Sequence, residues 1–192
     1  MEFLLDWDRE LFVFLHQGIE NSFFNWLLPV VRNRYIWIPF YIFIISYVVS
    51  SFSSLKAYYY LIFIIFSVVI TDQVSGKWLK YAVERNRPCH DTELVDVVTP
   101  RVHCRYSFSF PSSHATNHFG LAMILSFLLF RNKLKWKVGL FGWASLISIA
   151  QVYVGLHYPS DIIVGAILGI TLIQLFIVAI NPIVKRFEDH SV

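Results

Sequence analysis

The sequence predicts an all-α integral membrane protein, a helical bundle of five to six helices with an N-terminal interfacial helix. Hydrophobic residues make up 56% of the chain and charged residues only 15%, which is too little polar surface for a water-soluble protein of this size. Five apolar runs approach or exceed the roughly 20 helical residues that cross a hydrocarbon core. At 192 residues, the chain has room for a single membrane domain over residues 1–192.

The expected elements follow in chain order. Residues 1–31 mix apolar and charged side chains, which predicts an interfacial helix and a short membrane-dipping segment, with a sixth span as the alternative. The five spans are expected at Tyr35–Ser51, Tyr58–Leu79, Phe110–Phe130, Val138–Leu156 and Ile162–Ile180. Each must be helical, because lipid offers no partners to the backbone of an open strand. Residues 80–109 form the one long polar stretch, and such a loop in a compact protein usually has a function.

Lysine and arginine in the short loops predict the orientation, because they accumulate on the cytoplasmic side. If the five spans alternate, one side carries Lys56, the four positive charges of residues 131–137, and Lys185 with Arg186. The 80–109 loop is then extracytoplasmic and faces the periplasm of a Gram-negative cell. Arg32 and Arg34 run against this count.

The only two cysteines, Cys89 and Cys104, both lie in the outward loop. An oxidising compartment favours a disulfide between them. Two free thiols are the alternative.

Three polar clusters sit where the spans meet the outward surface. They are residues 80–88 at the end of the second span, residues 111–114 at the start of the third, and residues 157–161 between the fourth and fifth. The clusters are distant in sequence, and the topology alone brings them to one membrane face. The sequence therefore predicts a single site there.

Two of these clusters suit a phosphate group. Lys80 and Arg87 place two cations near one point, and arginine can bind two phosphate oxygens at once, although either residue alone is more simply explained by snorkelling to the interface. Ser112 and Ser113 begin a helix, where unpaired N–H groups and the helix dipole favour an anion.

The third cluster supplies a reactive pair. Asp161 follows His157 by four positions, and a carboxylate on one imidazole nitrogen leaves the other nitrogen free to attack. A lone interfacial histidine is more often a polar anchor. A histidine with this aspartate, a second histidine at position 114 and two cations is not well explained in that way.

With these motifs in this order and spacing, the chain resembles the type 2 phosphatidic acid phosphatase (PAP2) family of integral membrane lipid phosphatases. The resemblance covers about residues 72–180 and implies a two-step mechanism without metal or cofactor. In that mechanism His157 forms a phosphohistidine, Asp161 orients it, and His114 acts as general acid and then base. The phosphoryl oxygens would be held by Lys80, Arg87, Ser112, Ser113 and, in place of a family arginine, Gln151.

Two departures from the family pattern matter. Ser113 stands where the second motif usually has glycine, and it keeps the backbone N–H. Ala150 and Gln151 stand where the third motif has serine and arginine, so a neutral donor replaces a charged one. Losing one donor to a transition state costs about 10²–10³ in rate, and Arg85, Arg101 or Arg105 could partly substitute for the missing cation.

Other polar residues have simpler interpretations. His114 and His118 have the spacing of a metal pair but lack an obvious third ligand, so His118 is expected to line the pocket or bond a backbone carbonyl. Asp72 is expected in a polar patch that supports Lys77 or Lys80. Tyr153 and Tyr158 are interpreted as aromatic-belt residues.

The sequence therefore predicts hydrolysis of a lipid phosphate or diphosphate, in a bacterial inner membrane with the active site facing the periplasm. A lipid phosphotransferase and a catalytically weak lipid-phosphate binder are the alternatives, the second suggested by the missing arginine. Expected partners are the lipid substrate and membrane lipids. The net charge of +3 suggests no nucleic-acid partner, and the oligomeric state stays open.

Overall fold

The computed structural model describes residues 2–189, and none of these lies in a β-strand. The helices are α1 (Glu2–Val13), α2 (Ser22–Val31), α3 (Ile38–Ser51), α4 (Ser54–Gln73), α5 (Lys80–Val83), α6 (Ser113–Leu128), α7 (Leu134–Tyr153) and α8 (Pro159–Asp189). Shorter helical turns adjoin them, namely η1 (Phe14–Gly18), η2 (Arg34–Trp37) and η3 (Val74–Leu79). The expected all-α fold is confirmed.

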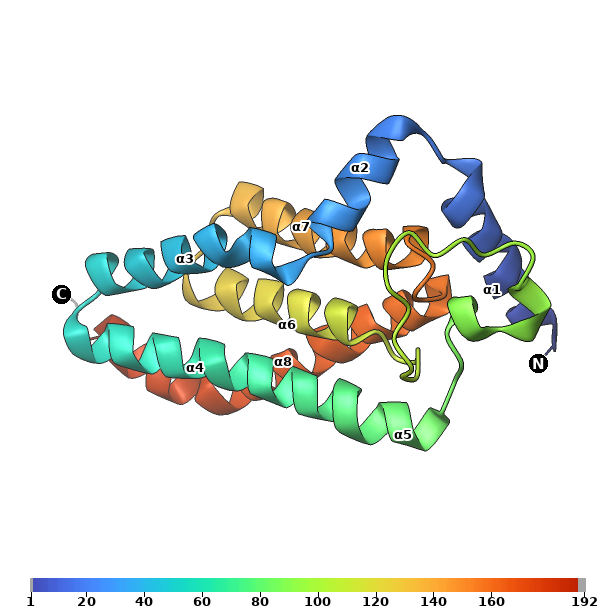
Figure 1. Cartoon of the computed structure of the whole chain (residues 1–192). Helices are drawn as coiled ribbons and strands as arrows, with labels where there is room; N and C mark the ends of the chain where they lie inside the picture. The colour runs from blue at the N-terminus through green and yellow to red at the C-terminus, as the bar shows by residue number, and fades with distance from the viewer. Residues whose placement is uncertain (1, 190–192) are drawn as a thin grey trace.

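Helices α3, α4, α6, α7 and α8 run side by side, and α6 packs against α4, α7 and α8 (Figure 1). Buried aliphatic and aromatic side chains from these helices form the core. Within the described residues, three stretches are long and apolar enough to cross a membrane, namely Arg34–Ser51, Ser54–Leu94 and Pro159–Phe187. The other two members of the bundle are α6, which has 16 residues, and α7, which has 20 and begins among lysines.

The helix ends differ from the expected spans. Helix α4 begins at Ser54 instead of Tyr58 and continues through η3 and α5 to Val83. Glu84 then adopts a left-handed backbone with φ of 53° and ends the helix. Helix α2 has ten residues, which rise about 15 Å, half of the hydrocarbon thickness. It is too short for a sixth span, and α1 and α2 instead lie over one end of the bundle (Figure 1).

Small residues bring α6 and α8 into backbone contact. A Cβ atom on Gly169 would lie 2.3 Å from the carbonyl oxygen of Thr116, and one on Gly165 would lie 2.7 Å from that of Ser112. Close approach at glycine is a common way for helices to pack in lipid. This close packing places the beginnings of α6 and α8 side by side, where the N–H of Ser112 donates to the carbonyl oxygen of Asp161 at 3.0 Å.

The basic loops and the polar clusters lie at opposite ends of the bundle. Ring contacts of Tyr59 with Phe187 and of Tyr47 with Phe130 hold the α3–α4 turn, the end of α8 and the α6–α7 loop together. The start of α8, α5 and the N-terminal helices lie at the other end (Figure 1). This arrangement agrees with alternating spans, except that Arg32 lies at the end that holds the polar clusters, where it contacts α7.

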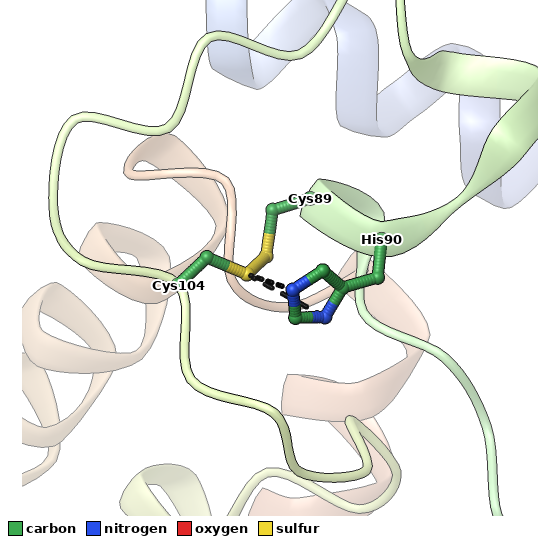
Figure 2. Close-up of side chains that lie close together, drawn as sticks. All are labelled: Cys89, His90 and Cys104. Carbon is green, nitrogen blue, oxygen red and sulfur yellow. Dashed lines mark hydrogen bonds between the residues drawn. A yellow bond between two sulfur atoms is a disulfide. The ribbon is translucent and has the colours of Figure 1, made fainter.

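Residues 84–112 connect α5 to α6 over this end and contain the turns η4 (Pro88–His90) and η5 (Thr92–Leu94). Cys89 and Cys104 form a disulfide with their Cα atoms 6.4 Å apart, and the ring of His90 lies beside it (Figure 2). The two cysteines pack against a buried cluster that includes Leu28 and Leu156. The bridge therefore ties the loop to α2 and to the segment that precedes His157.

For protein taken from native membranes, we expect mass spectrometry of non-reduced peptides to recover Cys89 linked to Cys104. Reduction should lower the melting temperature, because closing a loop of 15 residues stabilises by about 3 kcal/mol on the chain-entropy model. A Cys89→Ser/Cys104→Ser variant should be insensitive to reductant. Two freely alkylatable thiols would contradict the bridge. Loss of stability with a chelator would instead indicate a metal ion bound by these cysteines and His90, whose ligand atoms lie close enough together.

Candidate active site

The junction between α7 and α8 presents His157. The N–H of Leu156 donates to the carbonyl oxygen of Gln151 at 3.1 Å, and the N–H of Gly155 donates to that of Val152 at 2.9 Å. Together these two hydrogen bonds form a Schellman motif at the end of α7. Gly155 has φ of 87°, a conformation that strongly favours glycine. Pro159 then begins α8 at a position where no N–H is needed. His157 is thus fixed between two well-defined helix ends.

Asp161 binds both the start of α8 and the imidazole. Its Oδ2 accepts from the N–H of Tyr158 at 2.9 Å, which is one half of a capping box. The same oxygen lies 3.3 Å from Nδ1 of His157. Both side chains are buried, with 2% of His157 and none of Asp161 exposed. A carboxylate on Nδ1 selects the tautomer in which Nε2 keeps its lone pair.

The burial of His157 also keeps its imidazole neutral. Burial lowers its pKa to about 4, and the hydrogen bond to Asp161 only partly opposes that effect, while the charge of Arg87 adds to it. An ordinary histidine has a pKa of about 6.5. At neutral pH the nitrogen that faces away from Asp161 is therefore unprotonated and able to act as a nucleophile.

This burial predicts the acid limb of the pH–rate profile. Protonating His157 removes the nucleophile, so kcat/KM should stay high through pH 6 and fall only as the pH approaches 4. The measurement is a profile of kcat/KM from pH 3.5 to 9, corrected for the second ionisation of a phosphate monoester near pH 6. A corrected midpoint at 6.5 would contradict a buried, neutral His157.

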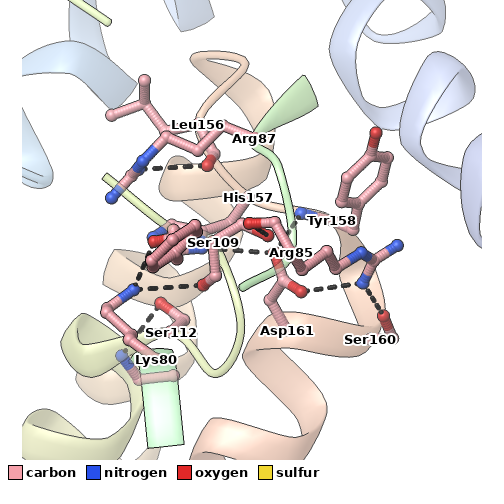
Figure 3. A network of polar contacts seen from close by, with 12 residues as sticks. Lys80, Arg85, Arg87, Ser109, Ser112, Leu156, His157, Tyr158, Ser160 and Asp161 are labelled. Atoms are coloured by element: carbon pink, nitrogen blue, oxygen red, sulfur yellow. Dashed lines mark hydrogen bonds and ion pairs between the residues drawn. The ribbon is translucent and has the colours of Figure 1, made fainter. Parts of the chain in front are cut away.

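Arg85 connects Asp161, which it contacts together with Ser160 in Figure 3, to Asp8 of the N-terminal helix. Its guanidinium donates to Oδ1 of Asp161 at 2.8 Å and to Oδ2 of Asp8 at 2.7 Å, and it lies 3.9 Å from the ring centroid of Tyr158. Asp8 is 8% exposed and also accepts from the N–H of Ser160 at 2.8 Å. Arg85 is thus committed to positioning the Asp161 carboxylate, and α1 helps to hold the beginning of α8.

Lys80 and Arg87 come from the end of the second span and the loop after it. The Lys80 amine donates to the carbonyl oxygens of Phe108 and Ser109 at 2.8 and 3.2 Å. Arg87, which is 9% exposed, donates to the carbonyl oxygens of Ser107 and Leu156 at 2.9 and 3.1 Å. These hydrogen bonds to neutral acceptors hold both cations in place beside His157 (Figure 3), and the charge of the Asp161 carboxylate acts on both.

The N-terminus of α6 supplies the remaining predicted residues. Ser112 is the N-cap and is fully buried, and the buried hydroxyl of Ser113 has no hydrogen-bond partner in the structure. Nδ1 of His118 bonds the carbonyl oxygen of His114 at 2.7 Å, as expected for a residue that bonds the backbone. His114 is the member of this turn that interacts electrostatically with His157.

Gln151 is fully buried and faces an unexpected partner. Its Oε1 accepts from Nε of Arg32 at 3.3 Å, and its Nε2 has no hydrogen-bond partner among the described residues. Of the arginines expected to replace the missing cation, Arg85 binds Asp161 and Asp8, as described. Arg101 donates to the carbonyl oxygen of Tyr153 at 2.8 Å. Arg105 is exposed, and its charge acts on both Arg32 and Arg87.

Three further expectations need correction. Tyr153 and Tyr158 are 0% and 2% exposed, so they belong to the packing around the site and not to an aromatic belt. The hydroxyl of Tyr153 donates a hydrogen bond to Oδ1 of Asn25, and the hydroxyl of Tyr158 donates one to Oδ2 of Asp91. Asp72 accepts from Asn117 at 3.0 Å across α4 and α6 instead of supporting a lysine.

Two cavities adjoin the site. One of about 640 Å³ is walled by apolar side chains of α3, α4 and α6 and reaches Ser113 and His114 at its polar end. Ile45 and Ile65 in its walls are 51% and 63% exposed, so the cavity opens on the flank of the bundle. The other, of about 610 Å³, lies under the loop and is lined by Lys80 and Arg87 together with polar residues and the aromatic rings of Tyr81, Tyr106 and Phe108.

A family model described as the PAP2 superfamily matches residues 56–185, which contain all three polar clusters. The chain belongs to the PAP2 superfamily. It is similar to PAP2 relatives named lipid A 4'-phosphatase, at 34% identity in Bacteroides thetaiotaomicron (88% of this chain, 75% of the relative) and 28% in Porphyromonas gingivalis (88% and 71%). The expectation of a PAP2-type lipid phosphatase is confirmed.

Solved structures of the superfamily support the fold. The chain superposes on the crystal structure of the transmembrane PAP2 type phosphatidylglycerolphosphate phosphatase from Bacillus subtilis with a TM-score of 0.66 and 22% identity. That match covers 100% of this chain and 89% of the other. The helical architecture of the bundle is therefore confirmed, and the three long apolar stretches together with the family match support an integral membrane protein.

Proposed function

We propose that this PAP2 protein hydrolyses a lipid phosphate or diphosphate monoester through a phosphohistidine on His157, without a metal ion. The observation that carries the proposal is the buried His157–Asp161 pair, with His114 at the polar end of an apolar cavity. His114 lines this cavity and interacts electrostatically with His157, so a proton donor would stand between the nucleophile and the space for a lipid chain.

In the first step, Nε2 of His157 attacks phosphorus and the bond between phosphorus and the lipid oxygen breaks. His114 gives its proton to that oxygen, which leaves as the lipid alcohol or, from a diphosphate, as the lipid monophosphate. Asp161 stabilises the positive charge that develops on the His157 ring. Lys80 and Arg87 bind the phosphoryl oxygens, where their positive charge favours the transition state.

In the second step, water attacks the phosphohistidine. His114, now unprotonated, accepts a proton from that water, the bond between phosphorus and nitrogen breaks, and inorganic phosphate leaves. The N–H of Ser113 at the start of α6 would donate to the same group at an anion-binding helix end, while the N–H of Ser112 is already bonded to Asp161.

The lipid chains of the substrate would lie in the apolar cavity between α3, α4 and α6. Its opening on the flank of the bundle suits entry of an amphiphile from the bilayer, with the headgroup at the depth of the polar clusters. Because two similar relatives are named lipid A 4'-phosphatase, a phosphate on a lipid A-type glycolipid is the favoured substrate. The site would face the periplasm of a bacterial inner membrane, since the basic loops lie at the opposite end of the bundle.

The test is phosphate release by purified protein in detergent with EDTA present. The lipid panel contains a lipid A phosphate, phosphatidic acid, phosphatidylglycerol phosphate and undecaprenyl diphosphate. We expect release from the lipid A phosphate and an acid-labile, base-stable phosphoenzyme on rapid quenching. Release only when an acceptor lipid is added would indicate a phosphotransferase. Failure with every lipid would contradict the proposal.

A further inference from the structure

Arg32, at the end of α2, is a charged residue to which neither the sequence nor the proposed mechanism assigns a role. It is only partly exposed, and its Nε donates to Oε1 of buried Gln151 at 3.3 Å across 119 positions of sequence. An arginine in this place has to lose hydration without a strong acceptor in return. Such an arrangement is costly unless a further anion binds there.

The surroundings of Arg32 are uniformly positive. Its charge acts on both Arg87 and His114, and burial together with the charge of Arg105 lowers the pKa of Arg32 itself. Among residues whose side chains are described, no carboxylate bonds to Arg32. Three guanidinium groups therefore act on one another in this region, and the hydrogen-bond acceptors of Arg32 and Arg87 are neutral.

One unpartnered polar atom belongs to Gln151 beside Arg32, and another belongs to Ser113, the neighbour of His114 in sequence. Nε2 of Gln151 and the hydroxyl of Ser113 are buried, and neither has a hydrogen-bond partner in the described part of the chain. A buried donor without a partner costs about 1–3 kcal/mol, so such groups call for a ligand or ordered water. A bound phosphoryl group offers three acceptor oxygens to these donors and to Arg32.

We propose that Arg32 is a phosphate-binding residue of this enzyme, contributed by the N-terminal segment and positioned by Gln151. It supplies the cation that the third motif lacks at position 151. Gln151 acts through its carbonyl oxygen, which orients the guanidinium, and through its amide, which donates to the phosphoryl group. The active site is then incomplete without α2.

The location of Arg32 fits this assignment. It runs against the loop charges that predict orientation, and its contact with Gln151 in the last turn of α7 places it at the end of the bundle that holds the polar clusters. An arginine whose role was only to set the membrane orientation would not need a hydrogen bond to buried Gln151. The proposal rests on the proposed phosphoryl chemistry, because its ligand is the phosphoryl group of that reaction.

The test compares full-length Arg32→Ala, Arg32→Lys, Gln151→Arg and the Arg32→Ala/Gln151→Arg double variant, with Arg131→Ala at the opposite end as the matched control. Readouts are kcat, KM, inhibition by orthovanadate and melting temperature. We expect Arg32→Ala to lower kcat by about 10²–10³ and to weaken vanadate inhibition, with an unchanged melting temperature. Arg32→Lys should keep part of the rate, because lysine retains the charge but not the planar fork.

The double variant makes the assignment specific. Gln151→Arg alone should lower activity, because it places a second guanidinium against Arg32, whereas in the Arg32→Ala background it should restore activity. This reversal of sign measures direct coupling between the two positions. A double variant no better than Arg32→Ala, or an Arg32→Ala enzyme with normal vanadate inhibition, would overturn the proposal.

If the wild-type protein releases phosphate from no lipid, the proposed function fails and Arg32 is tested by binding alone. Orthovanadate should then still raise the melting temperature of the wild-type protein and of Arg131→Ala, but not that of Arg32→Ala. Equal stabilisation of all three would reject Arg32 as an anion-binding residue, independently of turnover.

Discussion

Replacing His157 with alanine is expected to abolish phosphate release, with a fall in kcat on the order of 10⁶, the loss seen when a hydrolase loses its nucleophile. The imidazole is buried and has its Nδ1 against Asp161, so no neighbouring group can take over the attack from the same position. Because the side chain is held between two helix ends, the variant should fold normally. The measurement is phosphate release together with labelling of the enzyme by a radioactive lipid phosphate.

His114→Ala should give a different pattern, because general acid–base catalysis contributes about 10²–10⁴. With a p-nitrophenyl ester, whose leaving group needs no proton, the first step should survive and labelled phosphoenzyme should accumulate. With a lipid substrate, both steps should slow. His103→Ala is the matched control, since His103 is exposed in the loop and should keep normal activity. Equal, modest losses in His157→Ala and His114→Ala would count against the division of roles.

The sequence predicted most of the fold because lipid restricts the choices of the chain. An apolar run near 20 residues must be helical, so the bundle and its alternation follow from hydropathy. The helix ends were less predictable. Residues 80–83 were expected in the polar loop and yet continue the helix of α4 and η3 as α5, because a helix end depends on which backbone groups find other partners.

For the site, too, some residues could be predicted from the sequence and others could not. The three clusters at span ends could be predicted to converge, and the structure brings Lys80, Arg87, Ser112 and His157 to one end of the bundle. Asp8 and Arg32 belong to the same network but come from the N-terminal segment, 77 and 119 positions from the residues that they bind. No local pattern predicts contacts at that range. Asp8 is one of four acidic residues in α1 and carries no signal of its own, so the available signal was the arginine that broke the loop-charge pattern.

Asp161→Asn is expected to lower kcat by about 10⁴, the loss observed when asparagine replaces the aspartate behind a catalytic histidine and selects the wrong tautomer. The substitution removes the negative charge of the side chain but keeps its shape. An asparagine Oδ1 can still accept from the N–H of Tyr158, which holds the start of α8, so the melting temperature should change little. Asp96→Asn, an exposed acid in the loop, is the matched control and should keep full activity.

Asp8→Asn tests how far this effect extends. Asp8 binds Arg85, which in turn binds Asp161, so losing the Asp8 charge should loosen Arg85 and lower kcat by less than Asp161→Asn does, with KM unchanged. The two substitutions should also be non-additive, since residues in one network lose much of their separate effects once the chain is broken. A double variant whose losses multiply would mean that Asp8 affects catalysis by another route. Normal kcat in Asp161→Asn would mean that the carboxylate serves only the helix cap.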